Sequence, residues 1–189
     1  MTKLGPSFYC RPAIDLARDL IGKVLVRQIS GRTLRARIVE TEAYVGTHDL
    51  ACHAAKGRTR RTEIMFGPGG HAYVYFIYGM HDMFNVVAST EGDAQAVLLR
   101  AAEAMDGWTI NLSGPGRLAK GMQITRQLNG IDVTGDDLFV ADVGGAVPRI
   151  VTGPRVGVDY AGEWAREALR FADAESPAVS MPRMEGKQK

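Results

Sequence analysis

The sequence is poor in several features that define whole classes of protein. Two cysteines, Cys10 and Cys52, are too few for a disulfide framework or a four-cysteine zinc site. No apolar stretch approaches the roughly 18 residues that a membrane-spanning helix needs. The N-terminal residues lack the apolar core of a secretion signal, and the absence of low-complexity tracts excludes a long disordered protein. We therefore expect a soluble, cytoplasmic protein.

The length and composition suit one globular domain. The chain has 189 residues, of which 46% are hydrophobic, enough to bury a sizeable core. No internal repeat or Pro/Ser-rich linker divides it, and no strand leads into the GxGxxG of a doubly wound nucleotide-binding fold. We predict a single domain over residues 1–189, with a loose tail from about residue 176.

Charge is unevenly distributed along the chain. Residues 1–61 carry a net charge of +7, residues 62–113 carry −5 and residues 114–189 are neutral. The overall net charge of +2 does not show this uneven distribution. The basic part ends in a cluster suited to binding phosphates. An ordinary solvated loop would have the same composition, so the pattern permits a polyanionic partner without establishing one. The cluster consists of Lys56, Arg58, Arg60 and Arg61.

Alternating apolar residues, separated by turn residues, predict more strands than helices. Because these strands are linked as hairpins, we predict an α+β fold: a curved, open barrel-like antiparallel sheet with short flanking helices. The expected strands are residues 23–29, 33–45, 71–78, 83–90, 94–101, 138–141 and 155–158. The expected helices are residues 11–21, 113–125 and 161–169.

Two carboxylates close to each other form the first candidate site. In the strand over residues 33–45, Ala36 and Ile38 share one face, and alternation places Glu40 and Glu42 on that same apolar face. A carboxylate with few solvating partners tends to have a raised pKa and can act as a base. A strand end that emerges into solvent would carry surface glutamates instead, and the residues alone favour that interpretation.

An aromatic strand is the second candidate. Tyr73 and Tyr75 share one face of the strand over residues 71–78, and Phe76 and Tyr78 share the other. Flat rings beside a basic loop can stack on nucleobases. A packed core strand is the commoner role of such a run, although a tyrosine just before a glycine at a strand end is typical of an exposed position.

The remaining polar candidates are weaker. The four histidines do not form the H-E-x-x-H pattern of a metal site, so we expect no metal ion. Asn85 and Arg100 interrupt apolar strands, and a buried side chain of either kind needs hydrogen-bond partners. Such interruptions often mark functional sites, although an arginine at a strand edge can also extend to solvent. The histidines are His48, His53, His71 and His81.

Taken together, several segments resemble the alkyladenine DNA glycosylases, the human type of 3-methyladenine DNA glycosylase. They cover nearly the whole chain in the family's order. The matching segments are RIVETEAY at 37–44, followed by Asp49 and His53; HAYVYFIYGM at 71–80; Asn85; VLLR at 97–100; SGP at 113–115; and RVGV at 155–158 with AGEWAR at 161–166.

The resemblance implies a monofunctional enzyme of base excision repair. Such an enzyme flips an alkylated or deaminated purine (3-methyladenine, hypoxanthine or ethenoadenine) out of double-stranded DNA and hydrolyses its N-glycosidic bond. It implies no cofactor. We expect a monomer, associated with the nucleoid. The family's larger members have a long N-terminal extension that this chain lacks, so we expect a minimal catalytic domain of bacterial origin.

The resemblance also implies roles for individual residues. Glu42 matches the general base, which activates the attacking water. Arg100 and the backbone of Val156 match positions that hold this water. Tyr78 matches the side chain that is wedged into the duplex in place of the flipped nucleotide. An ionised Glu42 would in addition stabilise the positive charge that develops on the sugar.

A second set of residues matches the pocket for the flipped base. Tyr44, His53 and Tyr75 match the side chains that sandwich and hydrogen-bond this base. Asn85 matches the residue that disfavours guanine by crowding its exocyclic amine. The pocket also takes in Ala51 and Leu98, and the basic loop with Lys56, Arg58, Arg60 and Arg61 would contact DNA phosphates.

The chain departs from the family pattern in two places. The family often has proline at the position of Arg60 and asparagine near Thr62, which would alter the rigidity of this loop and the lesion preference. Asp82 and Met83 replace an aromatic residue and a cysteine, and an acid beside the wedge would weaken DNA affinity.

Two other functions are compatible with the same residues. A glycosidase acting on sugar polymers could use Glu40 and Glu42, because two strand positions separate them by roughly 7 Å, within the loose range for an inverting pair. A non-catalytic nucleic-acid-binding module could use the tyrosine strand and the basic loop. It would bind DNA regardless of damage, and its behaviour would not depend on Glu42.

Overall fold

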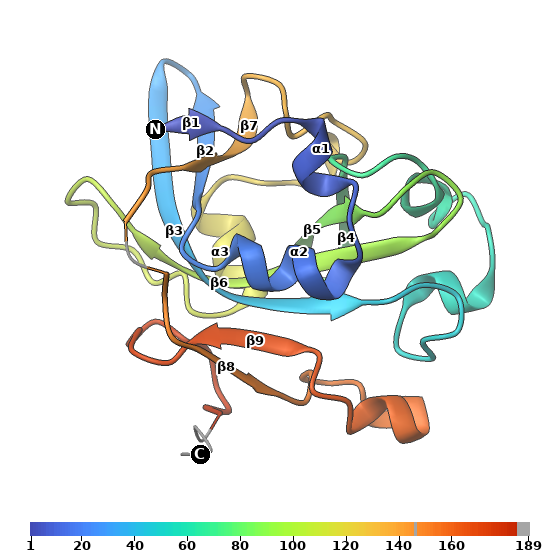
Figure 1. Cartoon of the computed structure of the whole chain (residues 1–189). Coiled ribbons are helices and arrows are strands. Elements are labelled where there is room, and N and C mark those ends of the chain that lie inside the picture. Colours follow the sequence, from blue (N-terminus) through green and yellow to red (C-terminus); the bar gives the residue numbers. More distant parts are fainter. Residues whose placement is uncertain (146, 185–189) are drawn as a thin grey trace.

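The computed structural model describes residues 1–145 and 147–184. These residues form a single α+β domain, as predicted, built on an antiparallel sheet that is curved but not closed (Figure 1). Three helices pack on the sheet: α1 (Pro6–Tyr9), α2 (Ala13–Leu20) and α3 (Pro115–Gly121). The strands are β1 (Thr2–Lys3), β2 (Val24–Ile29), β3 (Arg32–Tyr44), β4 (Ala72–Ile77), β5 (His81–Ala88), β6 (Gln95–Ala104), β7 (Leu138–Asp142), β8 (Ile150–Gly153) and β9 (Arg170–Asp173).

The long strand β3 organises the sheet. The main order is β1-β7-β2-β3-β6-β5-β4, and the hairpin of β8 and β9 joins at β3. The first half of β3 pairs with β2, whereas its residues 40–42 pair with β9. Its second half therefore pairs with β6 on one side and, at residues 40–42, with β9 on the other.

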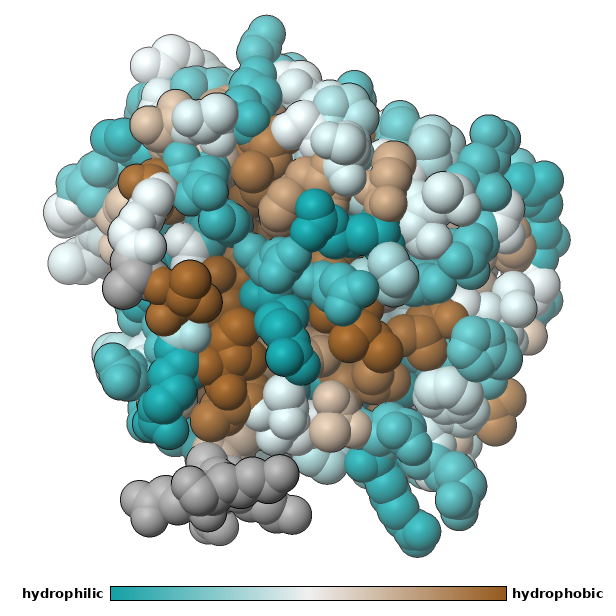
Figure 2. Space-filling model, viewed as in Figure 1, coloured by the Kyte–Doolittle hydropathy of each residue, from teal (hydrophilic) through white to brown (hydrophobic). Residues whose placement is uncertain are grey.

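The sheet curves around one apolar core that α2 and α3 share (Figure 1). Helix α2 buries Leu16 and Leu20 against β3 and β6, and α3 buries Leu118 against β5 and β6. The buried positions of α2 recur at helical spacing, and its Asp15 and Arg18 side chains face solvent. On the face in Figure 2, hydrophilic side chains accordingly separate the apolar areas around α2.

A β-bulge in β3 reverses the orientation that simple alternation predicts for Glu40 and Glu42. Ile38 pairs with Ala102 and Glu40 with Ala101, so Val39 is an additional residue in β3. Thr41 then pairs with Leu99, so that Arg100 is an additional residue in β6. An additional residue moves every following side chain to the opposite face of the sheet. Ile38 therefore packs in the shared core, and Glu40 and Glu42 point away from it. The prediction that both glutamates continue the face of Ala36 and Ile38 is wrong.

The C-terminal third differs most from the sequence predictions. Strand β7 agrees with the prediction over residues 138–141, but β8 and β9 were not predicted, and the segment predicted as a strand over residues 155–158 is a loop. Pro154 cannot donate to a ladder, and Gly157 has φ +75°, so neither favours a strand. The helix predicted over residues 161–169 is instead a short 3-10 segment, Asp159–Ala165, that leads to β9.

The remaining connections also contain 3-10 turns. The predicted helix over residues 113–125 is confirmed only over the shorter span of α3. The polar loop before β4 holds two turns, and a third follows α3. They are His53–Lys56, Glu63–Phe66 and Arg126–Leu128.

The chain after residue 176 packs against the domain as far as the structure describes it. Ser176 and Ser180 are both buried, and Ser180 donates its backbone N–H to the Glu40 carboxylate at 2.7 Å. The predicted loose tail is therefore wrong for this segment. The buried carboxylate of Glu40 needs hydrogen-bond donors, and Ser180 provides one only if the segment packs against the domain. Residues 185–189 lie outside the described residues. Within the described residues, no helix is long and apolar enough to cross a bilayer.

Candidate active site

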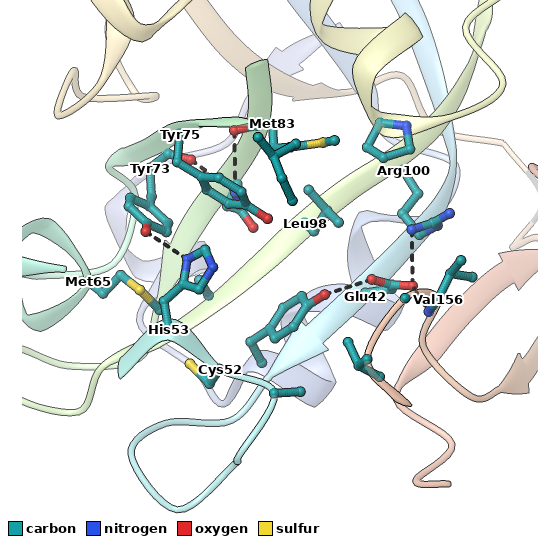
Figure 3. A pocket seen from close by; sticks show the side chains of 18 of the residues that line it. Glu42, Cys52, His53, Met65, Tyr73, Tyr75, Met83, Leu98, Arg100 and Val156 are labelled. Atoms are coloured by element: carbon teal, nitrogen blue, oxygen red, sulfur yellow. Dashed lines mark hydrogen bonds and ion pairs between the residues drawn. The ribbon is translucent and has the colours of Figure 1, made fainter. Parts of the chain in front are cut away.

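A cavity of about 350 Å³ opens between the second half of β3, strands β4 to β6 and the loop after β8 (Figure 3). It is large enough for a small organic ligand such as a purine. All ten residues predicted for the catalytic set, the base pocket and the wedge line it. They are Glu42, Tyr44, Ala51, His53, Tyr75, Tyr78, Asn85, Leu98, Arg100 and Val156.

Glu42 is fixed at one end of the cavity. Its side chain is fully buried, and one carboxylate oxygen accepts the Tyr44 hydroxyl at 2.9 Å. The other oxygen accepts the Val156 backbone N–H at 2.8 Å and lies 3.3 Å from a guanidinium nitrogen of Arg100. Figure 3 shows Arg100 and Val156 on the same side of the carboxylate. Three donors from three different segments therefore orient this carboxylate toward the cavity.

Aromatic side chains form the opposite wall. The rings of His53 and Tyr75 are 4.6 Å apart and tilted by 71°, and those of Tyr73 and Tyr75 are 5.4 Å apart. The Tyr73 hydroxyl lies 2.8 Å from Nδ1 of His53. Burial raises the pKa of Tyr75, and burial together with the charge of Glu42 raises that of Tyr44. Both phenols therefore stay neutral at physiological pH and present electron-rich faces to the cavity.

His53 is also neutral at physiological pH. Burial, followed by the positive charges of Arg61 and Lys56, lowers its pKa to about 4. A guanidinium nitrogen of Arg61 lies 3.5 Å from Nε2 of His53. A neutral imidazole has one donor and one acceptor nitrogen, and so it can bind either kind of ligand group.

Asn85 is held in the floor of the cavity by the sheet itself. It lies opposite Tyr73 in the β4–β5 pair and opposite Leu98 in the β5–β6 pair. Its side-chain amide donates to the backbone carbonyl of Tyr73 at 3.1 Å, and the residue is 3% exposed. The side-chain amide of Asn85 is therefore a fixed part of the floor of the cavity.

A buried ion pair that the residue patterns do not reveal connects the walls. Arg155 donates two hydrogen bonds to Asp49, at 2.5 and 2.8 Å, and both side chains are inaccessible to solvent. Asp49 also accepts the backbone N–H groups of Val45 and Ala51. Burial opposes the charge of Arg155, but its hydrogen bonds to Asp49 outweigh that effect and raise its pKa.

The position of Arg155 explains how the loop after β8 reaches Glu42. Its guanidinium lies 4.7 Å from the centre of the Tyr44 ring and donates to the carbonyl of Ala43 at 2.9 Å. Val156, the next residue, is thereby placed with its N–H on Glu42. The only sequence signal for this pair is the occurrence of both residues in the segments that carry the family resemblance.

Tyr78 lies at the tip of the hairpin between β4 and β5. It is 80% exposed, and its φ of 53° is in the left-handed region that non-glycine residues seldom adopt. It shares the rim of the cavity with Tyr160, which is 71% exposed and which no sequence argument singled out. Two exposed aromatic rings therefore flank the opening.

The four basic loop residues lie outside the cavity, on the exposed surface next to it. Arg61 covers the Tyr75 ring at 5.1 Å, and Arg58 lies over Phe66. Arg60 and Arg61 line a shallow groove that continues to Arg126. Lys56 and Arg58 are exposed on the same loop, beside the 3-10 turns.

Asp82, a departure from the family pattern, is not a free acid beside the wedge. Its carboxylate lies 3.1 Å from Arg126, which covers the ring of Phe76 at 3.9 Å. The positive charge of Arg126 offsets the negative charge of Asp82. Met83, the other departure, lines the cavity.

Several cavity residues were not predicted individually. Tyr73 was predicted only as a member of the aromatic strand and was not assigned to the base pocket, although it shares a strand face with Tyr75. Cys52 and Met65 come from the loop before β4, and nothing in their spacing indicates their position. Burial raises the pKa of the Cys52 thiol to about 11. In the part of the chain that the structure describes, no three His, Cys, Asp or Glu side chains are grouped to bind a metal ion.

Comparison with known proteins identifies the family of the chain. Residues 7–177 match the family model of methylpurine-DNA glycosylase. Relatives provisionally named 3-methyladenine DNA glycosylase match almost end to end. The one from Methanocella arvoryzae is 50% identical over 95% of this chain and 96% of its own, and the one from Myxococcus xanthus is 49% identical over 100% and 99%. One from Legionella pneumophila is 46% identical over 95% and 99%.

These matches define the class of protein, a DNA glycosylase of DNA repair. The chain belongs to the methylpurine-DNA glycosylase family, as the resemblance of its motifs indicated.

Proposed function

We propose that the protein removes alkylated and deaminated purines, such as 3-methyladenine, hypoxanthine and ethenoadenine, from double-stranded DNA. It does so by hydrolysing the N-glycosidic bond with a water molecule that Glu42 activates. The observation that carries this proposal is the buried Glu42 carboxylate, held by Val156 and Arg100 at one end of an aromatic cavity of about 350 Å³.

The cavity suits a flipped purine on both chemical and electrostatic grounds. A base stacked between Tyr44 and the rings of His53 and Tyr75 gains about 1–3 kcal/mol per aromatic contact. Of these bases, 3-methyladenine carries a positive charge while it is attached to DNA, and the faces of neutral tyrosines attract this charge. Asn85, fixed by its hydrogen bond to the Tyr73 carbonyl, would crowd the exocyclic amine of guanine.

The reaction follows from this placement. The bond between the sugar C1′ and the purine nitrogen breaks, and its electron pair leaves with the base. The oxygen of the water bonds to C1′, and the carboxylate of Glu42 takes a proton from that water. Negative charge on Glu42 also stabilises the positive charge that develops on the sugar. Arg100 and the N–H of Val156 orient the carboxylate and the water.

Tyr78 and the basic loop would bring the nucleotide to the cavity. Tyr78, exposed at the tip of its hairpin, fills the gap that the flipped nucleotide leaves in the duplex. Lys56, Arg58, Arg60 and Arg61 lie on the adjoining surface, where they can bind backbone phosphates. Because residues of one chain line the cavity, the proposal requires no second subunit.

A glycosidase that acts on sugar polymers has no support in this arrangement. It needs two carboxylates that face the same cleft. Glu42 lines the cavity, but Glu40 does not, and its oxygens accept hydrogen bonds from Arg170 and Ser180.

The proposal is tested by single-turnover base release from duplexes that carry hypoxanthine or ethenoadenine, with EDTA present. The wild type should release the base, whereas Glu42→Gln should not, although it should still bind lesion DNA. Turnover by Glu42→Gln would contradict the role of Glu42. No release by the wild type from these duplexes or from methylated DNA would contradict the proposed function and favour a non-catalytic binding protein.

A further inference from the structure

Glu40 has no part in the proposed reaction, yet it is as fully buried as Glu42. One of its carboxylate oxygens accepts Nε of Arg170 at 2.5 Å, Nε of Arg100 at 3.1 Å and the Ser180 hydroxyl at 3.1 Å. The other accepts the Ser180 backbone N–H at 2.7 Å. Two charged partners and two hydroxyl or amide donors therefore compensate this buried charge.

The same cluster determines where Arg100 lies. Its Nε is bound by Glu40, one terminal nitrogen lies 3.3 Å from Glu42, and the other donates to the Ser180 hydroxyl at 3.2 Å. A planar guanidinium that is held at two of its nitrogens cannot rotate away from the third contact. Glu40 and Ser180, which do not line the cavity, therefore fix the contact between Arg100 and Glu42.

The charges around Glu42 are balanced by this arrangement. Glu40 and Glu42 are close to two guanidiniums, those of Arg100 and Arg170, and Arg170 is the direct partner of Glu42 in the β3–β9 pair. The other groups that face Glu42 are the phenols of Tyr44 and Tyr75 and the charge of Arg155. Loss of the Glu40 charge would leave the positive charges in excess.

We propose that Glu40 is a positioning residue for base release, and that Ser180 acts with it: together they hold the Arg100 guanidinium against Glu42. The inference rests on the proposed function. It makes the segment around Ser180, far from the cavity in sequence, a working part of the active site.

The test compares Glu40→Gln with Glu103→Gln in single-turnover base release at increasing enzyme concentration. Glu103 is a matched control, because it also pairs with an arginine, Arg37, and binds the C-terminal segment through the Ser176 hydroxyl, but has no contact with Arg100. Glu40→Gln should lower the rate at saturating enzyme about tenfold to a hundredfold. The enzyme concentration for half-maximal rate should stay the same. Glu103→Gln should leave both quantities unchanged.

The pH–rate profile separates positioning from a merely structural role. Glu40→Gln removes one negative charge and leaves two guanidiniums near Glu42, which favours the ionised form of Glu42. The acidic limb of the profile should therefore move to lower pH. A variant that is only less stable would lose active protein and keep the wild-type profile, which would contradict the inference.

A second variant decides the matter if Glu40→Gln does not fold. Ser180→Ala removes the hydroxyl contacts to Glu40 and Arg100 and keeps the backbone contacts to Glu40 and Arg170. It should lower the saturating rate several-fold at unchanged affinity. Wild-type rates in the folded variants would contradict the inference alone, whereas a wild type that releases no base would contradict the proposed function and with it this inference.

Discussion

At the scale of single residues, His53 has a pKa that its surroundings lower. Its pKa of about 4 lies below the ordinary value of 6.5, first because of burial and then because of Arg61 and Lys56. The unfolded chain therefore takes up this proton before the folded protein does. The contribution of His53 to stability is complete above pH 6.5 and is lost as the pH falls from about 6.5 toward about 4.

Substitution of the neighbouring arginine should shift this titration. In Arg61→Gln the pKa of His53 should rise, because a nearby positive charge has been removed. Arg60→Gln, one position away on the same loop, should leave it unchanged. Histidine NMR shifts recorded against pH measure both. Equal titration curves for the two variants would show that burial alone sets the ionisation.

The backbone of Tyr78 allows its conformation to be separated from its ring. Left-handed φ costs an L-residue roughly 1–2 kcal/mol, and glycine avoids this cost. Tyr78→Gly should therefore have a higher free energy of unfolding than Tyr78→Ala, by about 1 kcal/mol. Both should weaken capture of a flipped base equally, because both lack the ring. Thermal unfolding and ethenoadenine fluorescence measure the two effects, and full capture by either variant would contradict the wedge role.

At the scale of elements, the Asp49–Arg155 pair joins β3, the loop after it and the loop after β8. Asp49→Asn leaves Arg155 as a buried, uncompensated charge, which should lower the free energy of unfolding by about 3–5 kcal/mol. Asp106→Asn is the control, since the pair of Asp106 with Arg35 is 40% exposed on both sides and should matter by less than about 1 kcal/mol. Urea unfolding measures both. Similar small losses would mean that the loops are held by other contacts.

The elements also show where sequence patterns suffice. Alternation along β2 to β6 predicts the hairpins and the antiparallel sheet, and the shared face of Tyr73 and Tyr75 is confirmed. Alternation cannot predict the bulge at Val39, because the additional residue is defined only by the partner strand β6. Ladders of a few residues, such as β8 with β9, are too short for a period to emerge.

The site is less predictable from the residues than the fold. By pattern, Glu42 is one of two candidate carboxylates that the residues alone would assign to the surface, and only the family resemblance makes it the general base. Its partners Arg100 and Val156 are 58 and 114 residues away in sequence. The role of Ser180 gives no signal in the sequence, since a serine in a polar C-terminal segment is typical of a solvated tail.

At the scale of the whole molecule, the uneven charge of the chain has a measurable consequence. If the basic loop binds phosphates, the affinity for duplex DNA should fall with salt, with a slope set by the number of neutralised phosphates. The double substitution of Lys56 and Arg60 by glutamine should reduce that slope by about two. Arg32→Gln, an exposed site on the β2–β3 turn, should leave it unchanged. Fluorescence anisotropy over a salt series measures the slopes, and equal slopes would exclude this loop from the DNA contact.

The hydrogen bonds from Ser180 to Glu40 also have a consequence for the synthesis of the enzyme. Ser180 follows every strand that the structure describes, so a ribosome synthesises it after the whole sheet. Until then the carboxylate of Glu40 lacks two of its donors, and Arg100 lacks one of its anchors. A nascent chain can therefore complete its sheet while Arg100 is still incompletely positioned. On the inference above, the full rate of base release would therefore require that the chain be translated past Ser180.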